Sequence, residues 1–209
     1  MDGTLVDSLF LWDVLWSNLG EKYLNDKSFT PSVEDDKKVR TLTLKSAMQL
    51  IHDNYGLGES GEELLSIANS IMNDFYANRV ELKIGVREFL EHLKNKGVKM
   101  CIASATAPEL IEVALKHCDL EKYFLKVFSC GTIGKGKDEP DIFLQAVDFL
   151  GAEIKDTWMF EDSPTAIETA TKIGMPTVGI FDRYNYGQEK IKEIATEYIS
   201  STETLLKLI

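Results

Sequence analysis

Acidic, hydroxyl and basic side chains gather in four short segments of the chain, close to apolar runs. The first segment holds Asp2, and the others hold Ser104, Lys137, and the adjacent pair Glu161 and Asp162. Transfer of a phosphoryl group needs a nucleophile, a proton shuttle, a divalent metal and donors for the phosphoryl oxygens. These residue types could provide a proton shuttle, a metal site and phosphoryl-oxygen donors, so the four segments suggest phosphoryl transfer.

The pair Glu161 and Asp162 follows the apolar residues 158–160. Two acids at the end of a buried strand are costly unless a cation is present, and Mg²⁺ prefers hard oxygen ligands. The alternative role is capping of the next helix. We assign that role to Ser163, with Pro164 in the first turn, and capping does not account for two adjacent acids. The pair therefore predicts a Mg²⁺ site.

Ser104 ends an apolar run and precedes a helix that opens at Pro108. A hydroxyl at this point, together with the backbone N–H groups of Ala105 and Thr106, would form a phosphate-binding corner. Hydroxyl side chains also cap helices frequently, so capping of the following helix is the alternative.

The four segments together resemble, in order and approximate spacing, the motifs of the haloacid dehalogenase superfamily of phosphotransferases. The first motif of that family reads Asp-x-Asp-x-Thr/Val, and its first Asp is the nucleophile. Here Met1 stands at the first x, so the nucleophile is expected one residue before Met1. The resemblance implies that Asp2 is the general acid/base, which protonates the leaving oxygen and then activates water. Taken alone, Asp2 could be a frayed terminal residue.

The resemblance also assigns the lysine and the metal ligands. The family often reads Lys-Pro-x-Pro-Asp-x-Phe, and counting back from the Pro-Asp at 140–141 selects Lys137 to neutralise the nucleophile and the phosphoryl group. Asp138 stands where Pro is usual, which predicts a less rigid loop, and Lys135 is the alternative lysine. Asp162 is implied as a direct Mg²⁺ ligand and Glu161 as a direct or water-mediated one. The Asp2 carbonyl and the nucleophile would complete the metal site.

The elements that must position these residues follow an alternating pattern from about residue 86. Apolar spacing predicts helices that start at 86, 108, 140 and 164, and strands over 98–103, 127–130, 157–160 and 176–180. This order predicts an α/β fold with an open parallel Rossmann-like sheet and helices on both faces. Cores of the resembled family have their first strand in the middle of the sheet. A chain that starts at Met1 is therefore expected to leave a gap of about two strand spacings, each about 4.8 Å, so we expect the natural protein to start upstream.

Residues 9–82 show three apolar stripes at helical spacing and no strand-like run. We predict an all-helical cap domain over 9–82, inserted into a core domain of 1–8 and 83–209. The polar residues 25–38 are predicted to be a mobile loop. The resemblance is closest to members with a helical cap between the first two motifs, which include phosphoglycolate phosphatases, sugar-phosphate phosphatases and β-phosphoglucomutase. Such caps close over the site and choose the substrate.

The charge and composition of the chain limit the classes of partner that it could bind. The formal net charge of −11 disfavours nucleic acid as a partner. No apolar run reaches the roughly 18 residues of a membrane span, and no basic-then-apolar start indicates a secretory signal. The three cysteines, Cys101, Cys118 and Cys130, lack metal-type spacing, so we expect free thiols in a reducing cytoplasm.

The leading hypothesis is a Mg²⁺-dependent phosphatase, a hydrolase of small phosphorylated metabolites that acts through an aspartyl-phosphate. The chain as written lacks the nucleophilic Asp and is expected to be inactive. One alternative is a sugar phosphomutase of the β-phosphoglucomutase type, although the Ser-Arg pair expected in its cap is not recognised here. Another is a non-catalytic binding module. A monomer is the default for capped members of the family.

Overall fold

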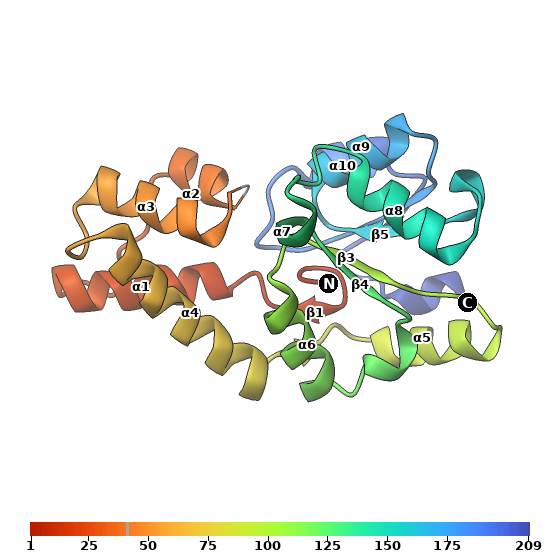
Figure 1. Ribbon diagram of the computed structural model, residues 1–209, viewed down its shortest axis with the longest axis horizontal. Helices are drawn as coiled ribbons and strands as arrows, with labels where there is room; N and C mark the ends of the chain where they lie inside the picture. Colours follow the sequence, from red (N-terminus) through yellow and green to blue (C-terminus); the bar gives the residue numbers. More distant parts are fainter. Residues whose placement is uncertain (41) are drawn as a thin grey trace. The chain divides into compact units, whose positions relative to one another are not determined.

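The computed structural model describes residues 1–40 and 42–209, which form two compact units (Figure 1). The α/β unit comprises Met1–Leu9 and Val80–Ile209, and the helical unit comprises Phe10–Arg79. We had placed the boundaries at 8/9 and 82/83. Residues 80–82 belong with the α/β unit because β1 (Val6–Asp7) pairs antiparallel with β2 (Glu81–Leu82).

The other strands of the α/β unit are parallel, as predicted. One set pairs β3 (Ile102–Ser104) with β4 (Val127–Ser129). The second set has the order β5 (Met159–Glu161), β6 (Thr177–Ile180) and β7 (Glu197–Ile199). The sequence pattern did not predict β7.

The parallel strands do not form the single open sheet that we predicted. Within residues 1–40 and 42–209, no ladder of hydrogen bonds joins the pair β3–β4 to the set β5–β6–β7. A single sheet would need direct pairing or a further strand between the two sets, since neighbouring strands lie about 4.8 Å apart. The resemblance places the first strand of such a core in the middle of the sheet.

Helices cover both sides of these strands, with α5 and α6 on one side and α8 and α9 on the other (Figure 1). Their starts agree with prediction to within one residue, and α8 ends at Gly151, whose φ of 64° suits a left-handed cap. Apolar residues of β4, α8 and α9 form one buried cluster. The helices of this unit are α5 (Val86–Asn95), α6 (Pro108–His117), α7 (Cys130–Ile133), α8 (Asp141–Leu150), α9 (Pro164–Lys172) and α10 (Gln188–Ile194), with short 3-10 turns at Glu121–Tyr123, Ile154–Asp156 and Leu205–Leu208.

The helical unit contains α1 (Leu11–Leu24), α2 (Val33–Val39), α3 (Leu44–Tyr55) and α4 (Gly61–Asn78). The prediction of a loop over 25–38 is wrong for its second half, where α2 forms. The Ser32 hydroxyl accepts a hydrogen bond from the Asp35 N–H and caps this helix, which a count of polar residues does not reveal.

The predicted apolar stripes of this unit form its core. The fully buried side chains include Leu15, Trp16, Leu19, Met48, Ile51 and Leu64. A buried acid lies beside this core: Asp36 is 6% exposed. The Trp16 Nε1–H donates to Asp36 at 2.8 Å, and the Arg40 Nε–H donates to its other oxygen at 2.8 Å. The aromatic stripe therefore serves packing and also holds one carboxylate.

Replacement of Trp16 by Phe tests this arrangement. We expect a loss of about 2 to 4 kcal/mol in the free energy of unfolding, because a hydrogen bond to a charged group and part of a buried ring are removed. The matched control is Trp158→Phe, since that side chain is 48% exposed and its substitution should change stability little. Urea unfolding of both variants measures the difference, and equal stabilities would contradict the expectation.

Other sequence expectations concern the cysteines and the membrane. Cys101, Cys118 and Cys130 are free thiols, and burial raises the pKa of Cys101 to about 11. In the part of the chain that the structure describes, no helix combines the length and apolar character needed to cross a bilayer.

Candidate active site

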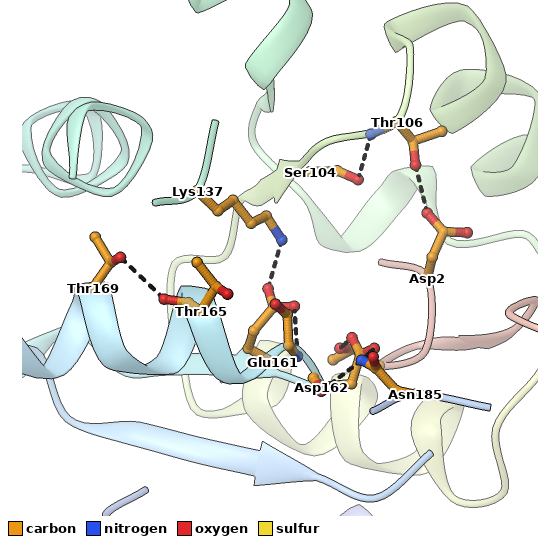
Figure 2. A network of polar contacts seen from close by, with 11 residues as sticks. Asp2, Ser104, Thr106, Lys137, Glu161, Asp162, Thr165, Thr169 and Asn185 are labelled. Carbon is orange, nitrogen blue, oxygen red and sulfur yellow. Dashed lines mark hydrogen bonds and ion pairs between the residues drawn. The ribbon is translucent and has the colours of Figure 1, made fainter. Parts of the chain in front are cut away.

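The predicted site residues come together from separate segments of the α/β unit. Ser104 ends β3, Glu161 ends β5 with Asp162 directly after it, and Lys137 lies in the loop before α8. Asp2 lies in the first turn of the chain. Figure 2 shows these side chains around one region beyond the strand ends. This is the edge where functional groups gather in parallel sheets.

Lys137 is the lysine that reaches the acidic pair. Its Nζ donates to the Glu161 carboxylate at 2.5 Å, and both side chains are largely buried. Burial disfavours the charged form of Lys137, yet the charge of Glu161 and the hydrogen bond raise the pKa of the lysine. Burial likewise opposes the charge on Glu161, but Lys137 holds the pKa of that carboxyl below its usual value. The alternative, Lys135, instead pairs with Asp141 at 2.8 Å and is half exposed.

The loop that carries Lys137 is attached to α9. The Thr169 hydroxyl donates to the carbonyl oxygen of Asp138 at 3.2 Å and to that of Thr165 at 3.0 Å (Figure 2). Thr169 is itself 7% exposed. A buried side chain thus ties the residue after Lys137 to the helix that follows the acidic pair.

The charge of Asp162 is compensated only in part by its surroundings. It is 4% exposed. Its Oδ1 accepts from the Thr4 hydroxyl at 3.0 Å, and its Oδ2 accepts from the Asn185 amide at 2.7 Å. Burial, followed by the charge of neighbouring Glu161, raises the pKa of Asp162 to about 7. A bound cation would therefore balance negative charge that Lys137 alone does not neutralise.

Ser163 occupies the N-cap of α9 with Pro164 in the first turn, as predicted, but its hydroxyl makes no cap hydrogen bond. The predicted capping interaction is therefore wrong in that detail. The Ser163 backbone N–H donates to the Glu161 carboxylate at 3.2 Å.

Asp2 is ordered by two hydroxyl groups. Ser8 donates to Asp2 Oδ1 at 2.7 Å, and Thr106 donates to Oδ2 at 2.7 Å. Asp2 also forms a bridge with Val6, so it is not a frayed terminal residue. Ser8 therefore serves Asp2 and not the following helix, since α1 starts after Phe10 without a side-chain cap.

Thr106 connects Ser104 to Asp2, because it makes hydrogen bonds to both residues. The Ser104 hydroxyl is buried and accepts from the Thr106 backbone N–H at 3.2 Å. Ala105 between them is exposed. The structure thus brings the Ser104–Thr106 corner and Asp2 together. Sequence reasoning missed the Thr106 side chain, although its position two residues after Ser104 in the same loop could have suggested it.

The predicted Mg²⁺ site can be compared with the side chains that could bind a metal ion. Within residues 1–40 and 42–209, no group of three or more His, Cys, Asp or Glu side chains is placed to hold a metal ion. The Asp2 carboxylate is directed to Ser8 and Thr106 rather than toward the acidic pair. Glu161 and Asp162 still fit Mg²⁺, because this ion commonly binds through one or two carboxylates while substrate phosphates and waters fill the rest. With one lysine against two buried acids, the donor set also has the charge that a divalent cation would balance.

Gly3 is required by the position of Asp162. Its φ is +64°, and a Cβ there would lie 2.3 Å from Asp162 Oδ2. We expect Gly3→Ala to displace the Asp162 carboxylate and to destabilise the protein by about 2 to 4 kcal/mol through overpacking added to backbone strain. The control is Gly97→Ala, whose φ of +74° brings similar strain with nothing within 4 Å. Urea unfolding should show a clearly larger loss for Gly3→Ala, and equal losses would show that the contact with Asp162 is unimportant.

Comparisons with known proteins find phosphatases among the relatives of this chain. The phosphorylated carbohydrates phosphatase of Thermotoga maritima is 24% identical over 206 residues, which cover 98% of this chain and 94% of the relative. Phosphoglycolate phosphatase 1 of Pseudomonas aeruginosa is 24% identical over 213 residues, covering 99% and 76% respectively.

Solved structures support the fold. The crystal structure of a candidate β-phosphoglucomutase from Thermotoga maritima superposes with a TM-score of 0.78 at 24% identity, covering 100% of this chain and 94% of that one. The model of the haloacid dehalogenase-like hydrolase family matches residues 1–180. With its α/β fold and this match over most of its length, the chain belongs to the haloacid dehalogenase-like hydrolases.

Proposed function

We propose that this hydrolase is a Mg²⁺-dependent phosphatase of small phosphorylated metabolites that acts through an aspartyl-phosphate. The observation that carries the proposal is the buried cluster of Lys137, Glu161 and Asp162 beside the hydroxyl-held Asp2. A net negative pocket with one lysine suits a divalent cation and the phosphoryl group that it accompanies.

Asp2 is the proton shuttle in this proposal. Its carboxylate is held from both sides by the Ser8 and Thr106 hydroxyls, at 2.7 Å each. A general acid/base must sit within hydrogen-bond reach of the proton that it moves. These two contacts fix its direction, so Asp2 can deliver a proton to the leaving oxygen and later accept one from water.

Lys137 and the corner at Ser104 and Ala105 bind the phosphoryl oxygens. Lys137 provides a fixed positive charge, because Glu161 and the Thr169 contact hold its side chain and its loop in place. The Ser104 hydroxyl and the Ala105 backbone N–H provide neutral donors, while the Thr106 N–H is engaged by the Ser104 oxygen. Donors placed before the reaction stabilise the charge that develops on the transferred group.

Glu161, Asp162 and the Asp2 carbonyl would hold the magnesium ion. A bound Mg²⁺ neutralises phosphoryl charge and helps to align attacking and leaving oxygens. Thr4 orients the Asp162 carboxylate from one side.

The nucleophile of the proposal is an Asp attached to the amino group of Met1. The location of that nitrogen supports this position, because it is buried near the charged groups of Lys137, Asp2, Glu161 and Asp162. A residue joined to this nitrogen would lie among the same charged groups.

The substrate class follows from the relatives and from the helical unit. The relatives are named as phosphatases of phosphorylated carbohydrates and of phosphoglycolate, and we extend this class, small phosphorylated metabolites, to the present protein. The helical unit, Phe10–Arg79, would act as the cap domain that closes over the site and excludes water. We expect a monomer, and the three free cysteines fit the reducing cytoplasm.

Phosphate release from a panel of small phosphoesters tests the proposal. The protein to assay is the chain extended upstream of Met1 by its genomic codons, read in frame, which we call the extended chain. We expect Mg²⁺-dependent release of phosphate from at least one sugar phosphate or phosphoglycolate. The matched control changes the residue before Met1 from Asp to Asn, and this control should lose turnover.

The other outcomes identify the alternatives. Conversion of a hexose 1-phosphate into glucose 6-phosphate without phosphate release would indicate a phosphomutase. Absence of an Asp codon before Met1, together with no turnover on the panel, would overturn the enzymatic proposal in favour of a binding module.

A further inference from the structure

The loop between β6 and α10 contains a residue that reaches the acidic pair and has no role in the proposal so far. This loop, residues 181–187, leaves the carboxyl end of β6, the neighbour of β5. The Asn185 side chain extends from it toward Asp162 (Figure 2). Asn185 Nδ2 donates to the Asp162 carbonyl oxygen at 2.7 Å and to Asp162 Oδ2 at 2.7 Å.

The two contacts fix both the backbone and the side chain of Asp162. Thr4 holds the other carboxylate oxygen at 3.0 Å. An ionised carboxylate has about four lone-pair sites, so one hydrogen bond from each side sets its orientation and leaves capacity for a cation. The neutral amide of Asn185 also stabilises the charged form of Asp162. Because the amide carries no positive charge, it leaves the negative charge of the site for the metal ion.

The orientation of the Asn185 amide is set by its own surroundings. The Tyr186 backbone N–H donates to Asn185 Oδ1 at 2.9 Å, which leaves the amide nitrogen as the atom directed at Asp162. Because the oxygen is engaged in this way, the donor role of Asn185 is specific.

The loop itself is anchored at both ends. At its start, Asp182 is 3% exposed and pairs with Lys83 Nζ at 2.7 Å, and it also accepts from the Tyr184 N–H at 2.9 Å. At its end, Gly187 lies so close to Pro164 that a Cβ would be 3.0 Å from that ring. The loop therefore presents Asn185 from fixed points on either side.

We propose that Asn185 is a positioning residue for the metal ligand Asp162, an inference that rests on the proposed Mg²⁺ site. Asn185 touches neither the substrate nor the reacting atoms in this account. It keeps the Asp162 carboxylate turned toward the cation. Removal of such an outer partner typically weakens metal binding by about 10- to 100-fold.

The test measures metal binding by the protein without any turnover. Mn²⁺ serves as the probe, and the electron paramagnetic resonance signal of free Mn²⁺ reports the dissociation constant. We expect Asn185→Ala to weaken Mn²⁺ binding by about 10- to 100-fold, and Asn185→Gln, which keeps an amide donor, to recover part of that loss. The matched control is Asn78→Ala, because Asn78 also donates an amide hydrogen bond to a carboxylate, Asp74, at 3.0 Å on an exposed helix.

One further variant and one further measurement make the outcomes distinct. Asp162→Asn should abolish the Mn²⁺ site, and thermal unfolding without metal should show each variant folded. If Asp162→Asn abolishes binding while folded Asn185→Ala binds Mn²⁺ like the parent, the inference about Asn185 is overturned and the metal site stands. If Asp162→Asn leaves Mn²⁺ binding unchanged, the proposed metal site fails, and the role of Asn185 fails with it.

Discussion

Substitution of Lys137 by Met in the extended chain is expected to reduce phosphate release by about 100- to 1,000-fold. Lys137 is the buried cation that contacts Glu161 at 2.5 Å, and in the proposed mechanism it binds the transferred phosphoryl group. Loss of one preorganised donor at a developing charge usually costs about 2.7 to 4 kcal/mol in the barrier. Steady-state phosphate release, measured at saturating Mg²⁺, gives the loss in kcat and in kcat/KM.

Lys135→Met is the matched control for this prediction. Lys135 lies two residues away in the same loop, but its partner is Asp141 and its side chain is 49% exposed. We expect that variant to keep nearly the parent rate. A similar loss in both variants would indicate that the loop as a whole matters, and an unaffected Lys137→Met variant would remove Lys137 from the mechanism.

Substitution of Lys83 by Met is expected to lower the free energy of unfolding by about 3 to 5 kcal/mol. Lys83 pairs with Asp182 at 2.7 Å, and the side chain of that acid is 2% exposed. Lys83 also donates to the Phe181 carbonyl at 2.9 Å. Removal of one partner leaves a buried charge without compensation, and this explains the size of the effect. Urea unfolding of the full chain measures it.

An exposed ion pair and a double variant serve as controls. Lys190→Met breaks the pair with Glu168, whose side chains are 52% and 40% exposed, and should cost less than about 1 kcal/mol. The double variant Lys83→Met with Asp182→Leu should recover most of the lost stability, because no charge then stays buried. If the double variant is no more stable than Lys83→Met, desolvation of Asp182 is not the cause.

The fold was predictable where the apolar periodicity agreed with residues, such as proline and glycine, that mark the ends of helices. The start of the helix at Pro164–Lys172 was predicted at the observed residue, since a proline opens it. By contrast, α2 lies in a polar stretch that reads as a loop, and the Ser32 cap that starts it gives only a weak local signal. Strand β7 is short and follows a charged helix, so its apolar content is too small to recognise.

The site was predictable where chemistry was unusual in sequence and unpredictable where it was ordinary. Two acids after an apolar run stand out in a single sequence, and the resemblance to the family selects Lys137 by its distance from Pro140. Thr106 and Asn185 do not, because threonine and asparagine are common in loops. Their contacts with Asp2 and Asp162 arise from tertiary structure, over separations of 104 and 23 residues. Thr106, Asp162 and Asn185 each follow the carboxyl end of a parallel strand, where segments distant in the sequence meet.

Mass spectrometry of a trapped phosphoenzyme tests the central claim most directly. In the extended chain with Asp2→Asn, the proton shuttle is removed, so hydrolysis of the covalent intermediate should become slower than its formation from an activated phosphodonor with Mg²⁺. After an acid quench, we predict one added phosphoryl group on the Asp that precedes Met1. Rapid turnover by this variant without any adduct, or an adduct on a different residue, would contradict the account.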